Sequence, residues 1–299
     1  MGIMVYTIYL EEMVGLFNRV VVFFNFVQRV YLPKTFDPNK CVANKVIDFG
    51  TALMLVAFTV LILFTSSVMI IFPRLPFLIG SIIPEKYFIL PVRLIVTPIQ
   101  IYISVSVHIT TLLLGISIYY YLCMITPIVT QELRMDQKKY KTLDRLRTPE
   151  TLIKVYRSLQ LLNISATYSC GPFIVPQQFI FSKFIVYCNY MLIVYSQQMS
   201  WATICLLGFW AFTFSLYWTT LLSFGGYLYV HCRRVLLSWK YHTWNCSSDT
   251  KLMSKFRRSC TPITLQFGTT FIIKSLTVLK FIRGLTVGTF RALMISGRR

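Results

Sequence analysis

The chain has 299 residues, of which 56% are hydrophobic and 13% are charged, and its formal net charge is +20. A soluble domain is about half apolar and about one quarter charged, so this composition excludes an ordinary soluble protein and indicates an integral membrane protein. Because the cations cluster between apolar stretches, we expect them to contact membrane lipids and expect no nucleic-acid partner.

The N-terminal segment, residues 1–49, is predicted to be cytoplasmic and amphipathic. Its apolar part is interrupted by Arg19, Asn25 and Arg29, and polar side chains at such intervals are costly in hydrocarbon. We therefore expect this segment to lie beside the membrane without crossing it.

Residues 50–299 are predicted to form a single membrane helix bundle with four clear spans. Each span is apolar over at least about 20 residues, the length of helix that crosses about 30 Å of hydrocarbon. The second span is longer, and one tilted helix that protrudes from the membrane accounts for it. Five prolines between residues 73 and 98 predict a loop with short helical pieces. The spans are residues 50–72, 94–129, 173–196 and 201–230.

Lys and Arg counts in the connecting segments predict the orientation. The segment before the first span carries five, and the basic loops 131–160 and 231–262 carry eight and seven. Residues 73–93 carry three, and the link 197–200 carries none. By the positive-inside rule, this alternation places the N-terminus and both basic loops in the cytoplasm. We expect a multi-pass protein of the plasma membrane.

The first basic loop contains its own helix signal. Thr148, Pro149 and Glu150 supply a capping hydroxyl, a proline for the first turn and an acid beside the helix N-terminus. The pair Gly171 and Pro172 predicts a break between this cytoplasmic helix and the third span.

The sequence offers few candidate catalytic residues. None of the ten acidic residues lies well inside a predicted span, the chain has three histidines, and its eight cysteines form no CxxC pair. Carboxylate catalysis and proton relays therefore lack intramembrane groups. We also find no phosphate-binding loop or nucleophile motif. The sequence predicts neither an enzyme nor a metal or cofactor site.

A polar stripe marks the second span. Its residues fall within an arc of about 80° on a helical wheel, so we expect them to avoid lipid and to face partner helices, water or a ligand. Interhelical hydrogen bonds that only hold the bundle explain the stripe equally well. In the third span, Gln178 and Asn189 repeat the pattern weakly. The stripe consists of Arg93, Thr97, Gln100, Ser104, His108, Thr111 and Gly115.

The last apolar segment, residues 264–294, is basic. Lys280, Arg283 and Arg291 form a cationic face of about 80° on a helical wheel, and each costs about 2.5 to 3.5 kcal/mol at mid-membrane. The helix therefore lies in the interface or crosses with this face turned toward water. We expect it to pack among neighbouring protein segments, because Gly284 and Gly288 offer a GxxxG surface.

Short motifs also mark the C-terminal region. Lys255 to Cys260 reads KFRRSC, Gly268 lies in a short linker, and GTFRAL runs from Gly288 to Leu293. This region resembles the C-terminal region of arthropod gustatory and odorant receptors. On that alignment the four spans correspond to the third to sixth helices of a seven-helix fold, and the tail corresponds to the seventh. The chain is then a divergent or N-terminally truncated member.

The resemblance implies a homo- or hetero-tetrameric, ligand-gated cation channel that detects small organic tastants or odorants. Gly284, Gly288, Thr289 and Phe290 would then lie where the last helices pack around a central pore. Thr289 matches the family's threonine, whereas Phe290 replaces its tyrosine and Arg291 intrudes. Cations in the last helix repel permeant cations, so they face away from the pore or the chain does not conduct.

Other functions fit the same composition. A small-molecule or lipid transporter is one alternative, although the spans show no convincing repeat. A non-conducting membrane scaffold or a receptor fragment is another. We expect the polar stripe to lie near the ligand if the chain is a receptor.

Overall fold

The computed structural model describes residues 2–33, 42–72, 82–87, 89–244, 246–267 and 271–296. Helices make up nearly all of this part of the chain, which confirms the prediction of an all-α fold. A two-residue strand β1 (Gln266–Phe267) pairs antiparallel with β2 (Phe271–Ile272) just before the last helix. The long helices are α1 (Gly2–Tyr31), α2 (Val42–Ile71), α4 (Leu90–Pro127), α5 (Pro149–Val194), α6 (Trp201–Tyr241), α7 (Ser247–Ser259) and α8 (Thr277–Ser296).

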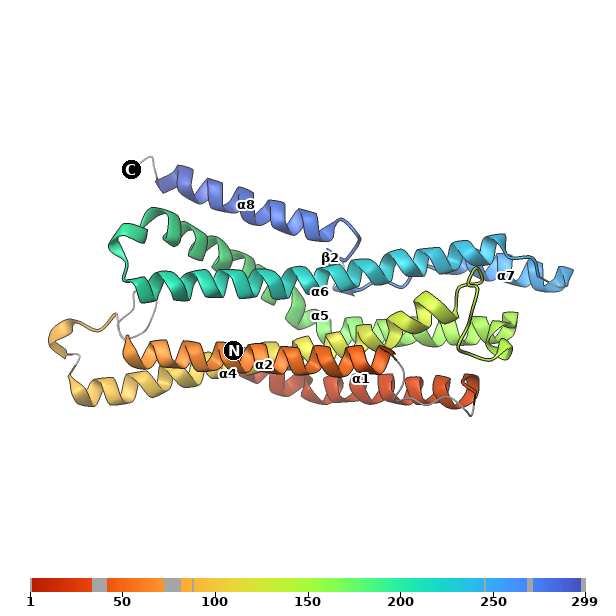
Figure 1. Ribbon diagram of the computed structural model, residues 1–299, viewed down its shortest axis with the longest axis horizontal. Coiled ribbons are helices and arrows are strands. Elements are labelled where there is room, and N and C mark those ends of the chain that lie inside the picture. Colours follow the sequence, from red (N-terminus) through yellow and green to blue (C-terminus); the bar gives the residue numbers. More distant parts are fainter. Residues whose placement is uncertain are drawn as a thin grey trace.

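The helices form an elongated bundle. In Figure 1, α1, α2 and α4 run side by side along one flank, and α5, α6 and α8 form the other. α1 and α4 also contact α5, so the two flanks share one core. A helix pairs its backbone N–H and C=O groups within itself, so helices can cross hydrocarbon without leaving these groups unpaired.

Within the described residues, four helices are long and apolar enough to cross a membrane, consistent with a multi-pass membrane protein. One matches the predicted span 50–72, and two longer helices contain the predicted spans 94–129 and 201–230. The fourth candidate lies in α1, where the sequence predicted an amphipathic segment. The candidates are Glu11–Tyr31, Asp48–Ile71, Leu90–Glu132 and Trp201–Tyr241.

α1 has apolar side chains on two faces. Leu16 and Val20 are buried against the bundle, while Val22 and Phe26 are exposed on the outer side. An outer face of this kind suits lipid, which a helix lying beside the membrane would not require. Arg19 is accommodated because its guanidinium donates a hydrogen bond to the Ser165 hydroxyl of α5, 2.7 Å away.

α4 continues without interruption into a π-helical turn, Ile128–Glu132, and is the one long helix that the sequence predicted. Its start differs from the predicted loop. Pro91 sits in the first turn, where no backbone N–H is required, and Pro98 lies inside the helix. The short helical piece Glu85–Tyr87 agrees with the prediction. Residues 73–81, which hold two of the five prolines, lie outside the described part of the chain, as does Gly268.

α5 begins at Pro149 with Thr148 as its N-cap residue, as predicted, although the Thr148 hydroxyl bonds Thr151 and not a backbone N–H. The predicted break at Gly171 and Pro172 is wrong, because the helix runs on to Val194. Figure 1 shows α5 changing direction along its length. Prolines inside a helix bend it without ending it where neighbouring helices hold both halves. The predicted span 173–196 falls on the second half of α5, which is not among the four described helices apolar enough to cross a membrane.

The C-terminal segments also differ from the predicted boundaries. α6 extends to Tyr241, so the basic loop 231–262 begins as helix and contains α7. The last helix begins at Thr277, and the described residues before it, 264–267 and 271–276, are extended segments, strands and turns and not part of a span. α8 packs on α5 and α6.

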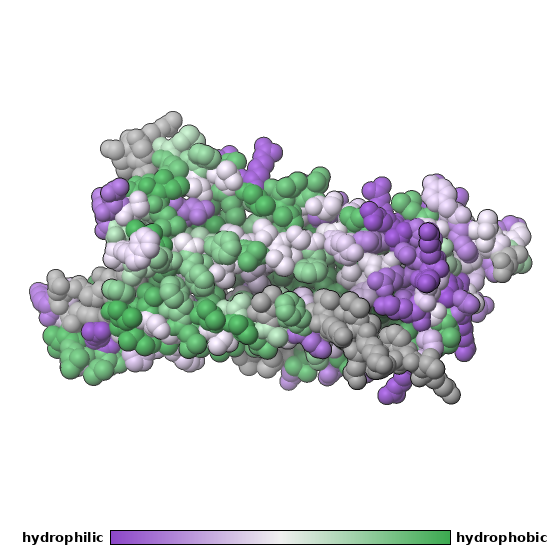
Figure 2. Space-filling view, in the orientation of Figure 1, coloured by the Kyte–Doolittle hydropathy of each residue, from purple (hydrophilic) through white to green (hydrophobic). Residues whose placement is uncertain are grey.

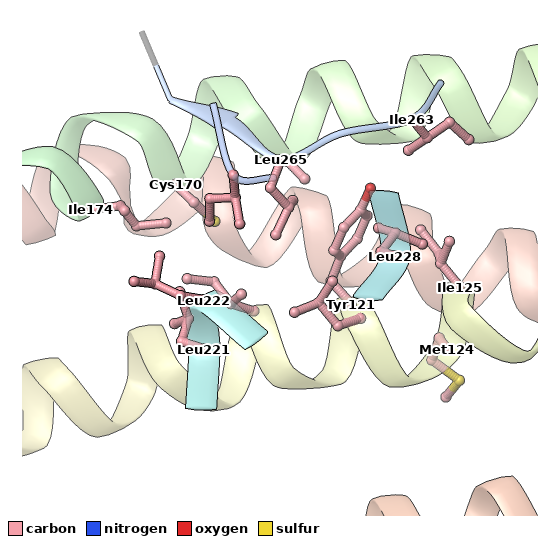
Figure 3. Close-up of a cluster of buried hydrophobic side chains, with 14 of the residues drawn as sticks. Tyr121, Met124, Ile125, Cys170, Ile174, Leu221, Leu222, Leu228, Ile263 and Leu265 are labelled. Carbon is pink, nitrogen blue, oxygen red and sulfur yellow. The ribbon is translucent and has the colours of Figure 1, made fainter. Parts of the chain in front are cut away.

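The core lies where α4, α5 and α6 meet the extended segment before β1. Figure 3 shows Tyr121 of α4 with its hydroxyl directed toward the segment that carries Ile263 and Leu265. The hydroxyl donates to Asn163 Oδ1 of α5 at 2.8 Å, and Asn163 Nδ2 donates to the Thr264 carbonyl at 2.9 Å. These bonds satisfy polar groups inside an otherwise apolar core.

Candidate functional site

The polar stripe of α4 faces the interior of the bundle. Thr97, Gln100, His108 and Thr111 are buried, and Ser104 is half-buried. The outermost member, Arg93, is exposed, and its guanidinium donates to the Ile70 carbonyl of α2 at 3.0 Å. From Thr97 to Thr111 the stripe is thus turned toward the interior of the bundle, as its spacing predicts.

A pocket of about 330 Å³ lies along the middle of the stripe. Four helices contribute to it, and three of its lining residues, Gln100, Ser104 and His108, belong to the stripe. Pockets for small molecules are typically 300–1,000 Å³ and mostly apolar, with few polar groups. The remaining lining residues are Met69 of α2, Ile103 and Val107 of α4, Ile180, Phe181 and Phe184 of α5, and Trp210 and Phe214 of α6.

His108 lines this pocket and has one ring nitrogen without a hydrogen-bond partner. Its Nδ1 lies 2.6 Å from the Ser104 carbonyl oxygen, which can only accept, so Nδ1 carries the hydrogen. In the neutral ring, Nε2 is then an acceptor. This nitrogen is buried and has no hydrogen-bond partner, and the side chain is only 5% exposed. A buried acceptor without a partner costs about 1–3 kcal/mol, which a donor group on a ligand would recover.

Aromatic side chains form the opposite wall. Phe214 stacks on the His108 ring with centroids 6.3 Å apart, and Phe181 packs against Phe214 with centroids 4.6 Å apart. Phe184 contacts both Phe214 and Trp210. Trp210 is held in place because its Nε1–H donates to the Thr65 hydroxyl of α2 at 3.3 Å. The wall therefore offers flat apolar surfaces to a ligand.

The stripe continues past the pocket as a buried polar seam. Gln177 Nε2 of α5 donates to the Thr111 hydroxyl at 3.3 Å, while its Oε1 has no partner. One turn further, Gly115 makes room for Tyr217 of α6: a Cβ at that glycine would lie 2.8 Å from the Tyr217 oxygen. The Tyr217 hydroxyl is buried without a partner too. If the stripe served only to hold the helices together by hydrogen bonds, fewer of its polar groups should lack a partner, because buried polar atoms in proteins are usually paired.

The third-span residues lie differently from the prediction. Gln178 and Asn189 are half-buried, and neither lines the pocket. The Gln178 carbonyl accepts from the Ser182 hydroxyl within α5 itself. The neighbouring Gln177 meets the stripe instead. Sequence spacing missed it, together with the aromatic wall, because the bend of α5 decides which face meets α4.

The basic C-terminal helix packs through one face only. Phe281 is buried, and a Cβ at Gly288 would lie 3.0 Å from Val186 of α5. No atom lies within 4 Å of a Cβ at Gly284, so only one glycine of the predicted pair makes a close contact. Thr289 is half-buried, with its hydroxyl bonded to the Leu285 carbonyl within the helix. The exposed residues include Phe290 and the cationic face of Lys280, Arg283 and Arg291.

No protein-family model matches the chain, and no curated protein is significantly similar to it. A function for the chain is therefore inferred from the geometry of the site. A flat apolar pocket with one unpaired acceptor suits a small organic molecule that has a hydrophobic body and a single hydrogen-bond donor.

Proposed function

We propose that the chain is a chemosensory receptor subunit, similar to the arthropod gustatory and odorant receptors, that binds a small organic ligand between α2, α4, α5 and α6. The observation that supports this most directly is the unpaired Nε2 of buried His108 in an aromatic pocket. An inert scaffold has no need of such a pocket, because empty apolar space and unpaired acceptors both lower stability.

The pocket geometry sets the class of ligand. A phenol, an aromatic alcohol or an aryl amine places an O–H or N–H donor on His108 while its ring packs against Phe214 and Phe181. A charged ligand would lose its hydration without gaining an ion pair, since the lining carries no charged residue.

In the proposed channel, the C-terminal helix α8 would lie nearest the pore. In a tetramer of a multi-pass plasma-membrane protein with a cytoplasmic N-terminus, α8 helices from several subunits would gather around a shared axis. The cationic face of α8 is exposed, so in this assembly it turns away from permeant cations or the chain serves as a non-conducting partner. Ligand binding at α5 and α6 would reach α8 through the packing of Val186 on Gly288.

The test is ligand-evoked cation influx in cells that express the full chain, alone and with candidate partner subunits. His108→Phe keeps a flat ring but removes the acceptor. We therefore expect the phenol concentration that gives a half-maximal response to rise by about tenfold or more. Surface expression, measured on intact cells, should be unchanged.

His231→Phe is the matched control, because His231 lies far along α6 from Phe214 and does not line this pocket. Equal responses of the two variants would contradict the proposal. Ligand uptake without current would instead support a transporter.

A further inference from the structure

A second pocket, of about 340 Å³, lies at the hydrophilic end of the bundle. It is formed by the turn after α4, from Arg134 to Asp136, and by the last turns of α6, from Arg234 to Thr243. Figure 2 shows hydrophilic residues gathered at the end of the molecule where α6 finishes and α7 lies, next to the apolar body. The pocket therefore sits where the apolar surface of the bundle gives way to polar surface.

The walls of this pocket are held at fixed positions. Trp239 of α6 donates from Nε1 to the Leu133 carbonyl at 2.8 Å, and the Met135 N–H donates to the Ser238 hydroxyl at 3.2 Å. Trp239 and Leu133 are both buried. These bonds fasten the turn to α6, so the backbone that carries Arg134 is held beside the exposed Arg234.

The charges in the pocket leave one guanidinium unpaired. Arg134 binds Asp136 through two hydrogen bonds, which hold the pKa of that carboxyl below its ordinary value. Arg234 has no acidic partner among the residues that the structure describes. Arg134 and Arg234 both lie close enough to His231 to act on it electrostatically. Glu132, the nearest other acid in sequence, is occupied by the Thr142 hydroxyl and N–H groups.

The rim of the pocket is apolar. Leu237 is 42% exposed and Tyr241 is 74% exposed, both on the surface of α6 beside Arg234. A ligand that fills this site thus meets a cation and hydroxyl groups inside and apolar side chains at the edge. A free anion would use only the first of these, whereas a phospholipid uses both.

We propose that this pocket binds the phosphate headgroup of an anionic membrane phospholipid, with Arg234 as its main ligand. Arg134 contributes a second guanidinium edge while it stays paired with Asp136. The acyl chains then run back along α6 from Arg234, past the exposed Tyr227 and Phe224, toward the apolar body. The site requires that α6 crosses the membrane, and it does not depend on a receptor role.

The test is equilibrium binding of short-chain lipids to the full-length protein in a non-ionic detergent. Dioctanoyl phosphatidic acid should bind at least about tenfold more tightly than dioctanoyl phosphatidylcholine or inorganic phosphate. Arg234→Gln should lower the affinity for phosphatidic acid about tenfold, because it removes a charge-assisted hydrogen bond. Arg234→Lys keeps the charge but loses the planar guanidinium, so its affinity should lie between those of the unchanged protein and Arg234→Gln.

Two further variants separate a built site from general attraction. Arg258→Gln removes an exposed cation of α7 at the same end of the molecule and should change affinity by less than about twofold. Asp136→Asn frees Arg134 and should strengthen binding. Equal losses in Arg234→Gln and Arg258→Gln would overturn the proposal, as would inorganic phosphate that binds as tightly as phosphatidic acid. Unchanged thermal unfolding of Arg234→Gln shows that the loss is not misfolding.

Discussion

At the scale of single residues, Asn163 connects three parts of the chain. Its side chain accepts from Tyr121 of α4 and donates to the Thr264 carbonyl, and it belongs itself to α5. Tyr121 is only 2% exposed, so its hydroxyl has no access to water. An amide that satisfies two polar groups at once, in a low-dielectric interior, contributes more than a surface hydrogen bond does.

Asn163→Leu should therefore lower the stability of the protein by about 1–3 kcal/mol, because it leaves the Tyr121 hydroxyl unpaired. Thermal unfolding in detergent measures this change. Adding Tyr121→Phe should restore part of the loss, since the unpaired group is then gone. Gln160→Leu, which removes a longer 3.3 Å bond to the Thr261 carbonyl, is the control and should have an effect of about 0.5 kcal/mol or less. Equal losses in Asn163→Leu and Gln160→Leu would contradict this role for Asn163.

The residues of the pocket could be predicted in part. Gln100, Ser104 and His108 share a helix face, and helical periodicity alone places them together. The aromatic residues Phe181 and Trp210 come from other helices, and their approach to His108 depends on helix packing that periodicity does not contain. Adjacent glutamines in α5 differ by about 100° of helix rotation, so only the tertiary structure selects Gln177 over Gln178.

At the scale of elements, the segment before α8 crosses directly over α6. Two glycines of α6 permit this: a Cβ at Gly225 would lie 2.9 Å from Ile273, and one at Gly226 would lie 3.1 Å from the Lys274 backbone oxygen. The backbone oxygen cannot move aside as a side chain can. The position of the segment that leads into α8 thus depends on the absence of a side chain at Gly225 and Gly226.

Gly226→Ala should destabilise the protein relative to Gly208→Ala by about 1–3 kcal/mol, through overpacking. Gly208 lies on the same helix and has no atom within 4 Å of an added Cβ. Both substitutions gain the same helix propensity, so their difference in thermal unfolding isolates the steric cost. Equal stability of the two variants would show that the segment yields without cost.

Element boundaries were less predictable than element types. The helix start at Thr148 and the long α4 follow from local signals. The continuity of α5 past Pro172 does not, because packing supplied by other helices offsets the lost backbone bond. The cations of α1 suggested a helix outside the membrane, whereas Arg19 finds a partner on α5 that the sequence of α1 does not reveal.

At the scale of the whole molecule, an apolar body is joined to one hydrophilic end (Figure 2). Composition and the distribution of Lys and Arg predict this division. They do not predict the pocket between α2, α4, α5 and α6, which arises only when the four helices meet. The proposed binding of a small organic molecule depends on this pocket, which the stripe of α4 lines.

Trp210 offers the most direct measurement, since it lines the pocket and a heavy-atom ligand beside it quenches its fluorescence. A brominated phenol titrated into the purified full-length protein should quench part of the emission saturably. Trp210→Phe should remove the saturable part, and His108→Phe should shift it to about tenfold higher concentration. Quenching that never saturates, or that is equal in all three proteins, would mean that the phenol only partitions into the detergent, and it would contradict a ligand site on α4.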